Sequence, residues 1–185
     1  MDIKFLKSKN VTKIKTKKQL IVVHWAACTG PQCVNWFLSP GCHTSAHYVI
    51  DRHGNITQLV DEKYIAWHAG YSSLGDYPND LKRSKKPWNS INVCSVGIEL
   101  SGPPTAINKI IKKRGWNLKL WTGWPEDEIN ALVGLCIEIA GRWPGIRLTD
   151  HSTIAPRRKS DVKKGRGIDL FPWERLISET EIIEA

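Results

Sequence analysis

The stretch Gln19-Leu-Ile-Val-Val-His24 decides the fold, because it is a short, branched, apolar run that ends on a histidine. Runs of this length and composition are typical of buried strands, where branched side chains pack well on a pleated surface. Similar runs occupy residues 93–100 and 146–150. Each of the three is therefore expected to form a strand.

A β-hairpin is expected between the first two of these runs. Residues 46–52 and 55–60 have the pattern of two short strands, and Arg52-His53-Gly54-Asn55 supplies residue types that favour a turn between them. With the other three runs, the hairpin predicts a mixed β-sheet.

The clearest helix is expected over residues 125–142, where apolar residues recur at steps of three and four. A proline followed by three acidic residues marks its first turn, and Pro144-Gly145 ends it. A shorter helix is expected from near Pro31, and another from Pro172. The long helix should pack on the sheet, which gives an α/β fold.

Length and composition indicate one folded domain. The chain has 185 residues, of which 41% are apolar and 24% charged, and these values are ordinary for a globular protein. No apolar run approaches the roughly 20 residues that span a bilayer, and no internal repeat divides the chain. Residues 71–92 and 101–123 form long irregular stretches, and loops of that length in a compact domain are usually functional or mobile.

The N-terminal region is strongly basic. Residues 1–19 contain seven lysines and lack the apolar segment of a secretory signal, so we expect a basic arm and synthesis in the cytoplasm without export. The formal charge of +9 suggests an anionic partner, which could be nucleic acid, a membrane surface or an acidic cell-wall polymer. Lysines that merely solvate an exposed arm are the alternative.

The five cysteines are expected to be mostly free thiols, because their number is odd and no export signal accompanies them. Cys28, Cys33, Cys42 and His43 could instead form a structural zinc knot. Their spacings of five and nine residues fit no common zinc-finger pattern, which weakens that alternative.

His24, His151 and Asp161 form a set of metal ligands that are widely spaced in the sequence. Two neutral imidazoles and a carboxylate leave a tetrahedral zinc ion with one open position, as catalytic zinc sites require. Spacing alone is weak support, because a chain with six histidines often contains such a trio by chance.

Five short sequence motifs strengthen the assignment. They occur in the order Ile21-Val-Val-His24, Ser45-Ala-His-Tyr-Val-Ile50, Ala66-Trp-His-Ala-Gly70, Val96-Gly-Ile-Glu-Leu100 and His151-Ser-Thr-Ile-Ala-Pro-Arg-Arg-Lys-Ser-Asp161. Together they resemble the type 2 N-acetylmuramoyl-L-alanine amidase family over roughly residues 20–175. Members of that family cleave the amide bond between the lactyl group of N-acetylmuramic acid and L-alanine in peptidoglycan.

The resemblance implies a single domain with a central mixed β-sheet, flanking helices and a zinc groove on one face. It assigns the cofactor Zn²⁺ to His24, His151 and Asp161. It also implies three segments, which are a basic arm over residues 1–19, the zinc amidase domain over 20–176 and a tail over 177–185. In some relatives a cysteine pair bridges the region of Cys28 and Cys33, so these two residues could pair under oxidising conditions.

Two residues match catalytic positions of the family. Glu99 corresponds to the glutamate that acts as general base, and Ala46 stands where other members carry a tyrosine with that role. A glutamate in an otherwise apolar strand has few structural explanations, because burying an unpaired carboxylate is costly. Lys159 matches the lysine that faces the developing oxyanion, although Arg157-Arg158-Lys159 could also be a solvated basic loop.

The resemblance also places substrate contacts at the edge of the groove. His68 and Trp67 are expected to contact substrate, and His47 to orient its neighbours. Several of the nine tryptophans fall near the two long loops, where indoles could stack on sugar or peptide. Those are Trp67, Trp88, Trp116, Trp121 and Trp124, whereas Trp25, Trp36, Trp143 and Trp173 are expected in the core. Substrate preference is expected to depend on residues 101–123.

The expected partner is peptidoglycan or a muropeptide, with no nucleic acid, no membrane and a monomeric state. A phage endolysin, released to the wall through a holin, is favoured by the basic charge. A cytosolic amidase that recycles 1,6-anhydro-muropeptides is the alternative within the enzyme class. A non-catalytic peptidoglycan receptor of the same fold and a nucleic-acid-binding module are the rivals from other classes.

Overall fold

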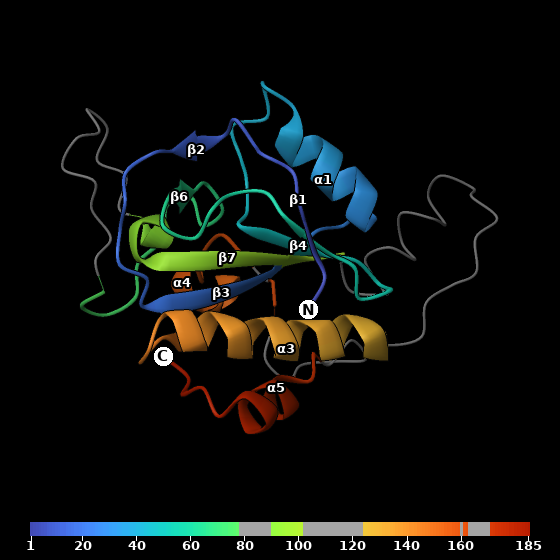
Figure 1. The fold of residues 1–185 in the computed structure, drawn as a ribbon. Helices are drawn as coiled ribbons and strands as arrows, with labels where there is room; N and C mark the ends of the chain where they lie inside the picture. The colour runs from blue at the N-terminus through green and yellow to red at the C-terminus, as the bar shows by residue number, and fades with distance from the viewer. Residues whose placement is uncertain (78–89, 102–123, 160, 163–170) are drawn as a thin grey trace.

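The computed structural model describes residues 1–77, 90–101, 124–159, 161–162 and 171–185 (Figure 1). Within these residues a six-stranded sheet has the order β1-β5-β4-β7-β3-β8. Its strands in that order are β1 (Ile3–Phe5), β5 (Ile56–Gln58), β4 (Tyr48–Ile50), β7 (Ser95–Leu100), β3 (Leu20–Trp25) and β8 (Arg147–Asp150). A separate antiparallel pair joins β2 (Val11–Thr12) to β6 (Ile65–Ala66).

Strand β3 lies inside the sheet, parallel to β7 on one side and to β8 on the other. This position explains its unbroken apolar run, because parallel strands are covered on both faces. Strand β4 is parallel to β7 and antiparallel to β5, as the predicted hairpin requires. The sheet is therefore mixed, and the predicted fold class is confirmed.

The two faces of β3 lie against different parts of the molecule. Ile21 and Val23 belong to the core on the side of helix α3 (Glu126–Arg142). Leu20 and Val22 point to the opposite side, because successive side chains of a strand alternate. His24 follows the same alternation and therefore points to the face away from α3.

Helices cover both faces of the sheet. The predicted helices α3, α1 (Gly30–Leu38) and α5 (Trp173–Thr180) are confirmed, with α3 and α5 on one face and α1 on the other (Figure 1). Thr29 and Gln32 form a capping box that starts α1. The 3₁₀ helix η1 (Ile91–Cys94) and the short helix α4 (His151–Ile154) were not predicted.

The N-terminal region is not the free arm expected from its lysines. Strand β1 pairs in parallel with β5, and β2 pairs with β6. Lys18 is 2% exposed and donates hydrogen bonds from Nζ to Thr16 Oγ1 and to the Tyr64 carbonyl. The pattern escaped prediction because the residues that face inward include polar ones, such as Ser8 and Asn10, rather than an apolar series.

The expected C-terminal tail also belongs to the sheet region. The backbone N–H of Leu148 donates to the Ile183 carbonyl, and the N–H of Ala185 donates to the Leu148 carbonyl. The boundaries expected at residues 19 and 176 therefore fall inside continuous structure, with residue 176 within α5.

Trp36 is a second correction, because its side chain is 60% exposed rather than part of the core. Helix α1 buries Gly30, Cys33, Val34 and Phe37, a stripe at helical spacing that excludes position 36. Trp173 is buried as expected. Most of the two long loops, with Trp88, Trp116 and Trp121, lies outside the described residues.

In the described part of the chain, no helix is both long enough and apolar enough to cross a bilayer.

Candidate active site

Two strand ends and the segment after α4 bring the predicted metal ligands together. His24 lies near the end of β3, and His151 directly follows β8, which is parallel to β3. Parallel strands end at the same edge of a sheet, where ligands usually bind. Asp150 fixes the start of α4, because its Oδ1 accepts a hydrogen bond from the Thr153 N–H at 2.6 Å. Asp161 reaches the same point from the segment after α4.

The ligand atoms are close together and buried. His151 Nδ1 lies 2.8 Å from His24 Nδ1 and 2.8 Å from Asp161 Oδ2, and His24 Nδ1 lies 3.6 Å from Asp161 Oδ2. The three residues are at most 9% exposed. Among the described residues they are the one group of three such side chains close enough to share a metal ion. The alternative zinc knot that includes Cys28 and Cys33 does not form.

A chain of hydrogen bonds determines which nitrogen of His24 carries a proton. The Ser95 hydroxyl donates to the Ile91 carbonyl at 2.7 Å, so its oxygen accepts from His68 Nε2 at 3.0 Å. His68 Nδ1 then accepts from His24 Nε2 at 2.8 Å. The lone pair of His24 therefore lies on Nδ1, which faces the other two ligands.

His151 is oriented in the same way by a backbone carbonyl. Its Nε2 lies 3.3 Å from the carbonyl oxygen of Ala69, which can only accept a hydrogen bond. The lone pair of neutral His151 is therefore also on Nδ1. Three acceptor atoms that face one another at these distances require a cation between them, either a proton or a metal ion.

The residues fit zinc. A tetrahedral zinc ion with ligand distances of about 2.0–2.2 Å holds its ligand atoms about 3.3–3.5 Å apart. The three separations, which run from 2.8 to 3.6 Å, need only small adjustments. Burial lowers the pKa of His24 to about 4, although Asp161 opposes this shift. Burial alone would raise the pKa of Asp161, but hydrogen bonds to His151 and His24 outweigh it and lower that pKa. A neutral imidazole and an ionised carboxylate are the forms that bind metal.

Glu99 lies beside His24, because strands β7 and β3 pair these two residues in register. Its side chain opens into the same cavity, and no hydrogen bond to its carboxylate comes from any described residue. Burial, then the neighbouring charge of Asp161, raise the pKa of Glu99 well above its ordinary value. A carboxylate whose pKa is raised is a stronger proton acceptor than an ordinary one, which makes Glu99 a candidate general base.

The cavity at this edge has a volume of about 390 Å³. The structure brings together at its wall the three predicted metal ligands and also Glu99, Lys159, His68 and Trp67. Trp124, which was expected near the groove, instead packs against Phe171 at the core on the side of α3. The wall consists of His24, Trp25, Phe37, Thr44, Ser45, Trp67, His68, Glu99, His151, Arg158, Lys159 and Asp161.

His47 lies behind this wall and is fully buried. Its Nδ1 accepts from the Gly97 N–H at 3.0 Å, and its Nε2 donates to the Tyr64 carbonyl at 3.1 Å. Burial lowers the pKa of His47 to about 3, so the ring stays neutral.

Gly97 has a specific role, because a Cβ atom there would collide with the ring of His68.

Sequence reasoning missed the residues that hold this geometry. Asn92 Oδ1 accepts from the N–H groups of both His68 and Ala69, at 3.1 and 2.8 Å. One carboxamide thus fixes the backbone that supplies the ring beside His24 and the carbonyl beside His151. Arg158 donates hydrogen bonds to the Ala69 and Tyr71 carbonyls. Its position inside the motif from His151 to Asp161 is a sequence signal that points to it. Asn92 gives no comparable signal.

The family comparison agrees with this site. The family model described as N-acetylmuramoyl-L-alanine amidase (Amidase_2) matches residues 15–164. The chain belongs to this family. Its ligand cluster, Glu99 and Lys159 all fall inside the matched segment of this amidase-family chain.

Two curated relatives show how far the similarity extends. N-acetylmuramoyl-L-alanine amidase AmiD of Escherichia coli (strain K12) is 28% identical over an alignment of 148 residues that covers 73% of this chain and 44% of AmiD. 1,6-anhydro-N-acetylmuramyl-L-alanine amidase AmpD of Enterobacter cloacae is 31% identical over 134 residues, which are 71% of this chain and 54% of AmpD. The chain thus spans about half the length of these relatives.

Solved structures share the fold. A selenomethionine derivative of AmpD superposes with a TM-score of 0.65 at 24% identity, covering 96% of this chain and 93% of AmpD. PlyL superposes with a TM-score of 0.61 at 16% identity, covering 97% of both chains.

Proposed function

We propose that this protein is a zinc-dependent amidase that hydrolyses the bond between the lactyl group of N-acetylmuramic acid and L-alanine. One observation carries the proposal. The Nδ1 lone pairs of His24 and His151 converge with an Asp161 oxygen in a cavity that also holds the Glu99 carboxylate. A receptor of the same fold would need neither this converging ligand set nor a buried carboxylate to which no described residue donates a hydrogen bond.

Zinc, when bound there, would polarise the amide carbonyl and lower the pKa of water. Glu99 is proposed to take a proton from the attacking water and return it to the leaving amine. Its position one strand from His24 supports this role, as does its freedom from any hydrogen bond to a described residue. A carboxylate already engaged by several donors would be a weaker base.

Lys159 is proposed to stabilise the negative charge that develops on the carbonyl oxygen. Its side chain lines the cavity, and its backbone N–H donates to the Ala155 carbonyl at 2.9 Å, which fixes the turn after α4. A positive charge held near the reacting atoms stabilises the transition state more than the ground state. Arg158 Nη2 donates hydrogen bonds to the Ala69 and Tyr71 carbonyls, and these bonds stabilise the same turn.

Two substrate forms are compatible with the proposal. Curated relatives include AmiD and the 1,6-anhydro-muropeptide amidase AmpD, whereas PlyL shares only the fold. An endolysin would act on the intact wall, and a recycling enzyme on soluble 1,6-anhydro-muropeptides. The cavity is open to solvent on one side and is lined by Trp67, which either substrate could contact.

Product analysis tests the proposal. The protein is incubated separately with intact sacculi and with a soluble 1,6-anhydro-muropeptide, and the products are identified by mass. We expect a stem peptide with a newly freed L-alanine amino group and a sugar with a newly freed lactyl carboxylate. New reducing sugar ends, or binding without any release of peptide, would contradict the assignment. The ratio of the two rates distinguishes the endolysin from the recycling enzyme.

A further inference from the structure

The N-terminal region forms a lysine-lined surface that the proposed reaction does not use. Its exposed lysines are separated by buried or half-buried residues, so that the charges point outward while the segment packs against the domain. The exposed lysines are Lys4, Lys7, Lys9, Lys13, Lys15 and Lys17. Backbone hydrogen bonds hold this segment in place, from Leu6 to Gln58, from Ser8 to Leu59 and from Thr16 to Lys63. These charges are therefore part of a fixed surface.

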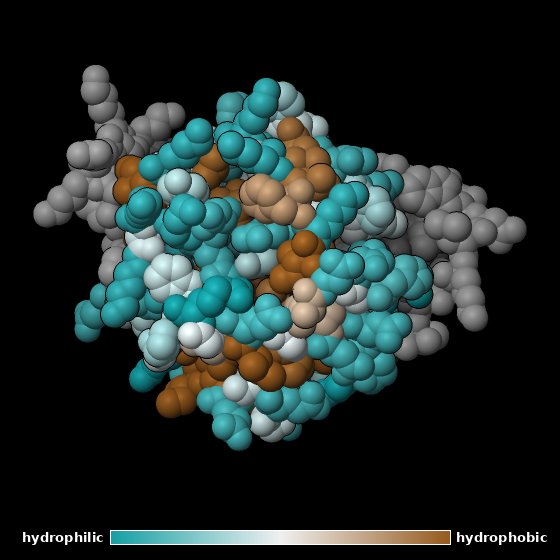
Figure 2. Space-filling view, in the orientation of Figure 1, coloured by the Kyte–Doolittle hydropathy of each residue, from teal (hydrophilic) through white to brown (hydrophobic). Residues whose placement is uncertain are grey.

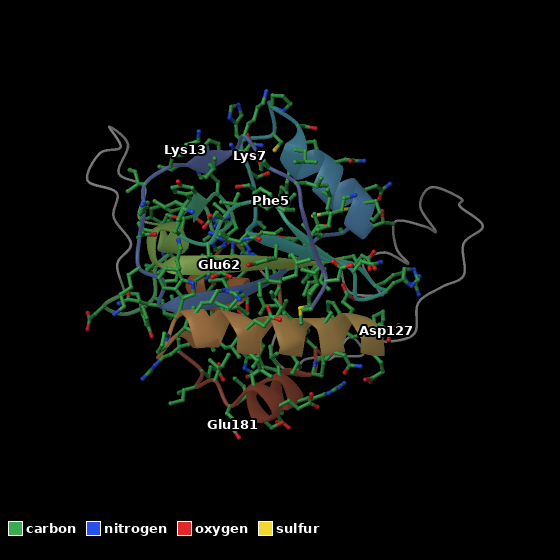
Figure 3. The ribbon with its side chains drawn as sticks, viewed as in Figure 1. Phe5, Lys7, Lys13, Glu62, Asp127 and Glu181 are labelled. Atoms are coloured by element: carbon green, nitrogen blue, oxygen red, sulfur yellow. The ribbon has the colours of Figure 1, made fainter. Side chains whose placement is uncertain are left out.

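A groove of about 260 Å³ opens between two of these lysines. Lys7 and Lys13 stand at its rim, and Figure 3 shows them at the same end of the molecule with Phe5 close by. The floor is apolar and includes Val11 and Leu59. In the same orientation, Figure 2 shows hydrophilic side chains around an apolar patch in this region.

Strand β2 forms a shared wall between this groove and the active-site cavity. Val11 lines the groove, whereas Thr12 Oγ1 accepts a hydrogen bond at 2.9 Å from Nε1 of Trp67, which lines the cavity. Neighbouring residues of a strand face opposite sides, which accounts for this division. Ser45, another cavity residue, donates to the Asn10 carbonyl at 2.6 Å. A polymer held in the groove would thus lie one strand away from the proposed reaction.

We propose that this groove binds a linear polyol-phosphate chain of the cell wall. Phosphates would pair with Lys7 and Lys13 at the rim, and the polyol carbons would contact the apolar floor. The one acidic side chain in the lining, Asp61, is already paired with Lys63. This choice of polyanion rests on the endolysin form of the proposed function, in which the enzyme acts on the intact wall.

Two other polyanions fit this surface less well. The segment forms two short strands, β1 and β2, rather than the amphipathic helix that usually lies in a membrane interface. Single-stranded nucleic acids usually bind through several stacking aromatic side chains. The groove lining contains two aromatic residues, Phe5 and Tyr64.

The test measures binding of the full-length chain to purified, labelled poly(glycerol phosphate) across a range of salt concentrations. We expect wild-type affinity to fall steeply with salt, as counterion release requires. Lys7→Gln/Lys13→Gln should weaken binding at least tenfold, whereas Lys7→Arg/Lys13→Arg should bind as wild type does. Lys13→Gln should weaken binding more than Arg147→Gln, which removes one exposed charge from the start of β8. Equal binding by wild type and Lys7→Gln/Lys13→Gln would overturn the proposal.

Parallel measurements identify the occupant and separate the two proposals. A single-stranded DNA oligonucleotide and phosphatidylglycerol vesicles serve as competing polyanions. Tighter binding of either, lost in Lys7→Gln/Lys13→Gln, would replace the wall polymer with that ligand. The same double variant should cleave a soluble muropeptide at the wild-type rate but cleave polymer-bearing sacculi more slowly. Absence of muropeptide cleavage by the wild type would refute the amidase function, while polymer binding would still report on the groove.

Discussion

Glu62 and Glu99 are two carboxylates within the same fold, and their surroundings are opposite. Glu62, labelled in Figure 3, accepts hydrogen bonds from the Tyr48 hydroxyl at 2.6 Å and from Trp143 Nε1 at 2.6 Å. It also accepts two from Arg142, at 2.7 and 3.2 Å. Glu99 lines the active-site cavity and receives no hydrogen bond from a described residue.

The difference separates a carboxylate that holds the structure from one that is available for chemistry. Glu62 joins the segment after β5 to the end of α3, because Arg142 and Trp143 donate hydrogen bonds to its carboxylate. Burial without such donors raises the pKa of Glu99. Glu128 lies between these extremes, because Oε1 accepts from Ser101 while Oε2 has no partner among the described residues.

The largest effect is expected for Glu99→Gln. Removing a general base typically costs about 10²–10⁴-fold in rate, and we expect a loss of about 10³-fold in kcat for muropeptide hydrolysis. Zinc content and thermal stability should stay at wild-type values, because no described residue donates a hydrogen bond to the carboxylate. Turnover assays and metal analysis on one preparation check both. A Glu99→Gln protein with undiminished turnover would remove Glu99 from the mechanism.

Glu128 should give the protein a specific pH dependence of stability. Burial raises the pKa of Glu128 to about 7, although hydrogen bonds from Ser101 oppose the shift. A group whose pKa is raised by folding contributes stability that is complete below its unfolded pKa and is lost as the pH rises through the folded value. Relative to Glu128→Gln, the wild type should lose up to about 3 kcal/mol of unfolding free energy between about pH 4.5 and 7.5.

Urea unfolding of both proteins at several pH values measures this difference. A constant difference across that range would show that Glu128 titrates normally, and would place it with the fully paired Glu62 in the comparison.

Glu62→Gln should affect stability rather than activity. The amide would present a donor to the Tyr48 hydroxyl, Arg142 and Trp143, so at least one buried donor would lose its acceptor. We expect a loss of about 2 kcal/mol of unfolding free energy, discounted because Arg142 is partly exposed. The activity of the folded protein at low temperature should match wild type. Large losses of turnover without any fall in melting temperature would break the distinction between the two carboxylates.

The smallest effect is expected for Ser95→Ala. The hydroxyl accepts from His68, whose other nitrogen accepts from His24, so its removal leaves that ring free to change tautomer. Partners of this kind typically contribute 10–100-fold to metal affinity, and we expect about a tenfold weaker affinity for zinc. Competition with a chromogenic chelator gives the dissociation constant. Unchanged zinc affinity would show that His24 is oriented without this chain.

Much of the sheet and of the ligand set could be predicted from sequence. Strand β3 was predictable because a strand covered on both faces must be apolar throughout, and α3 because its apolar stripe repeats at helical spacing. His24, His151 and Asp161 were recognised from the motifs around them, and the structure brings their ligand atoms within 4.8 Å of one another.

The supporting groups could not be predicted, because their roles depend on tertiary contacts between distant segments. Asn92 acts through two backbone N–H groups more than 20 residues away, and the Ala69 carbonyl acts with no side chain at all. Strands β1 and β2 were missed because buried Ser8 and Asn10 satisfy their polar atoms through the carbonyl of Phe37. Because these buried residues are polar, the sequence here does not show the alternation of apolar and polar residues that indicates a strand.

The most direct test of the zinc amidase assignment follows metal content and hydrolysis in the same sample. The protein is stripped with a strong chelator, the chelator is removed, and zinc is added stepwise while release of stem peptide is measured. We predict no turnover in the stripped protein and recovery that saturates at about one zinc ion per chain, as a single site with three protein ligands requires. Full turnover by the stripped protein, or a chain that binds zinc and releases no peptide, would contradict the assignment.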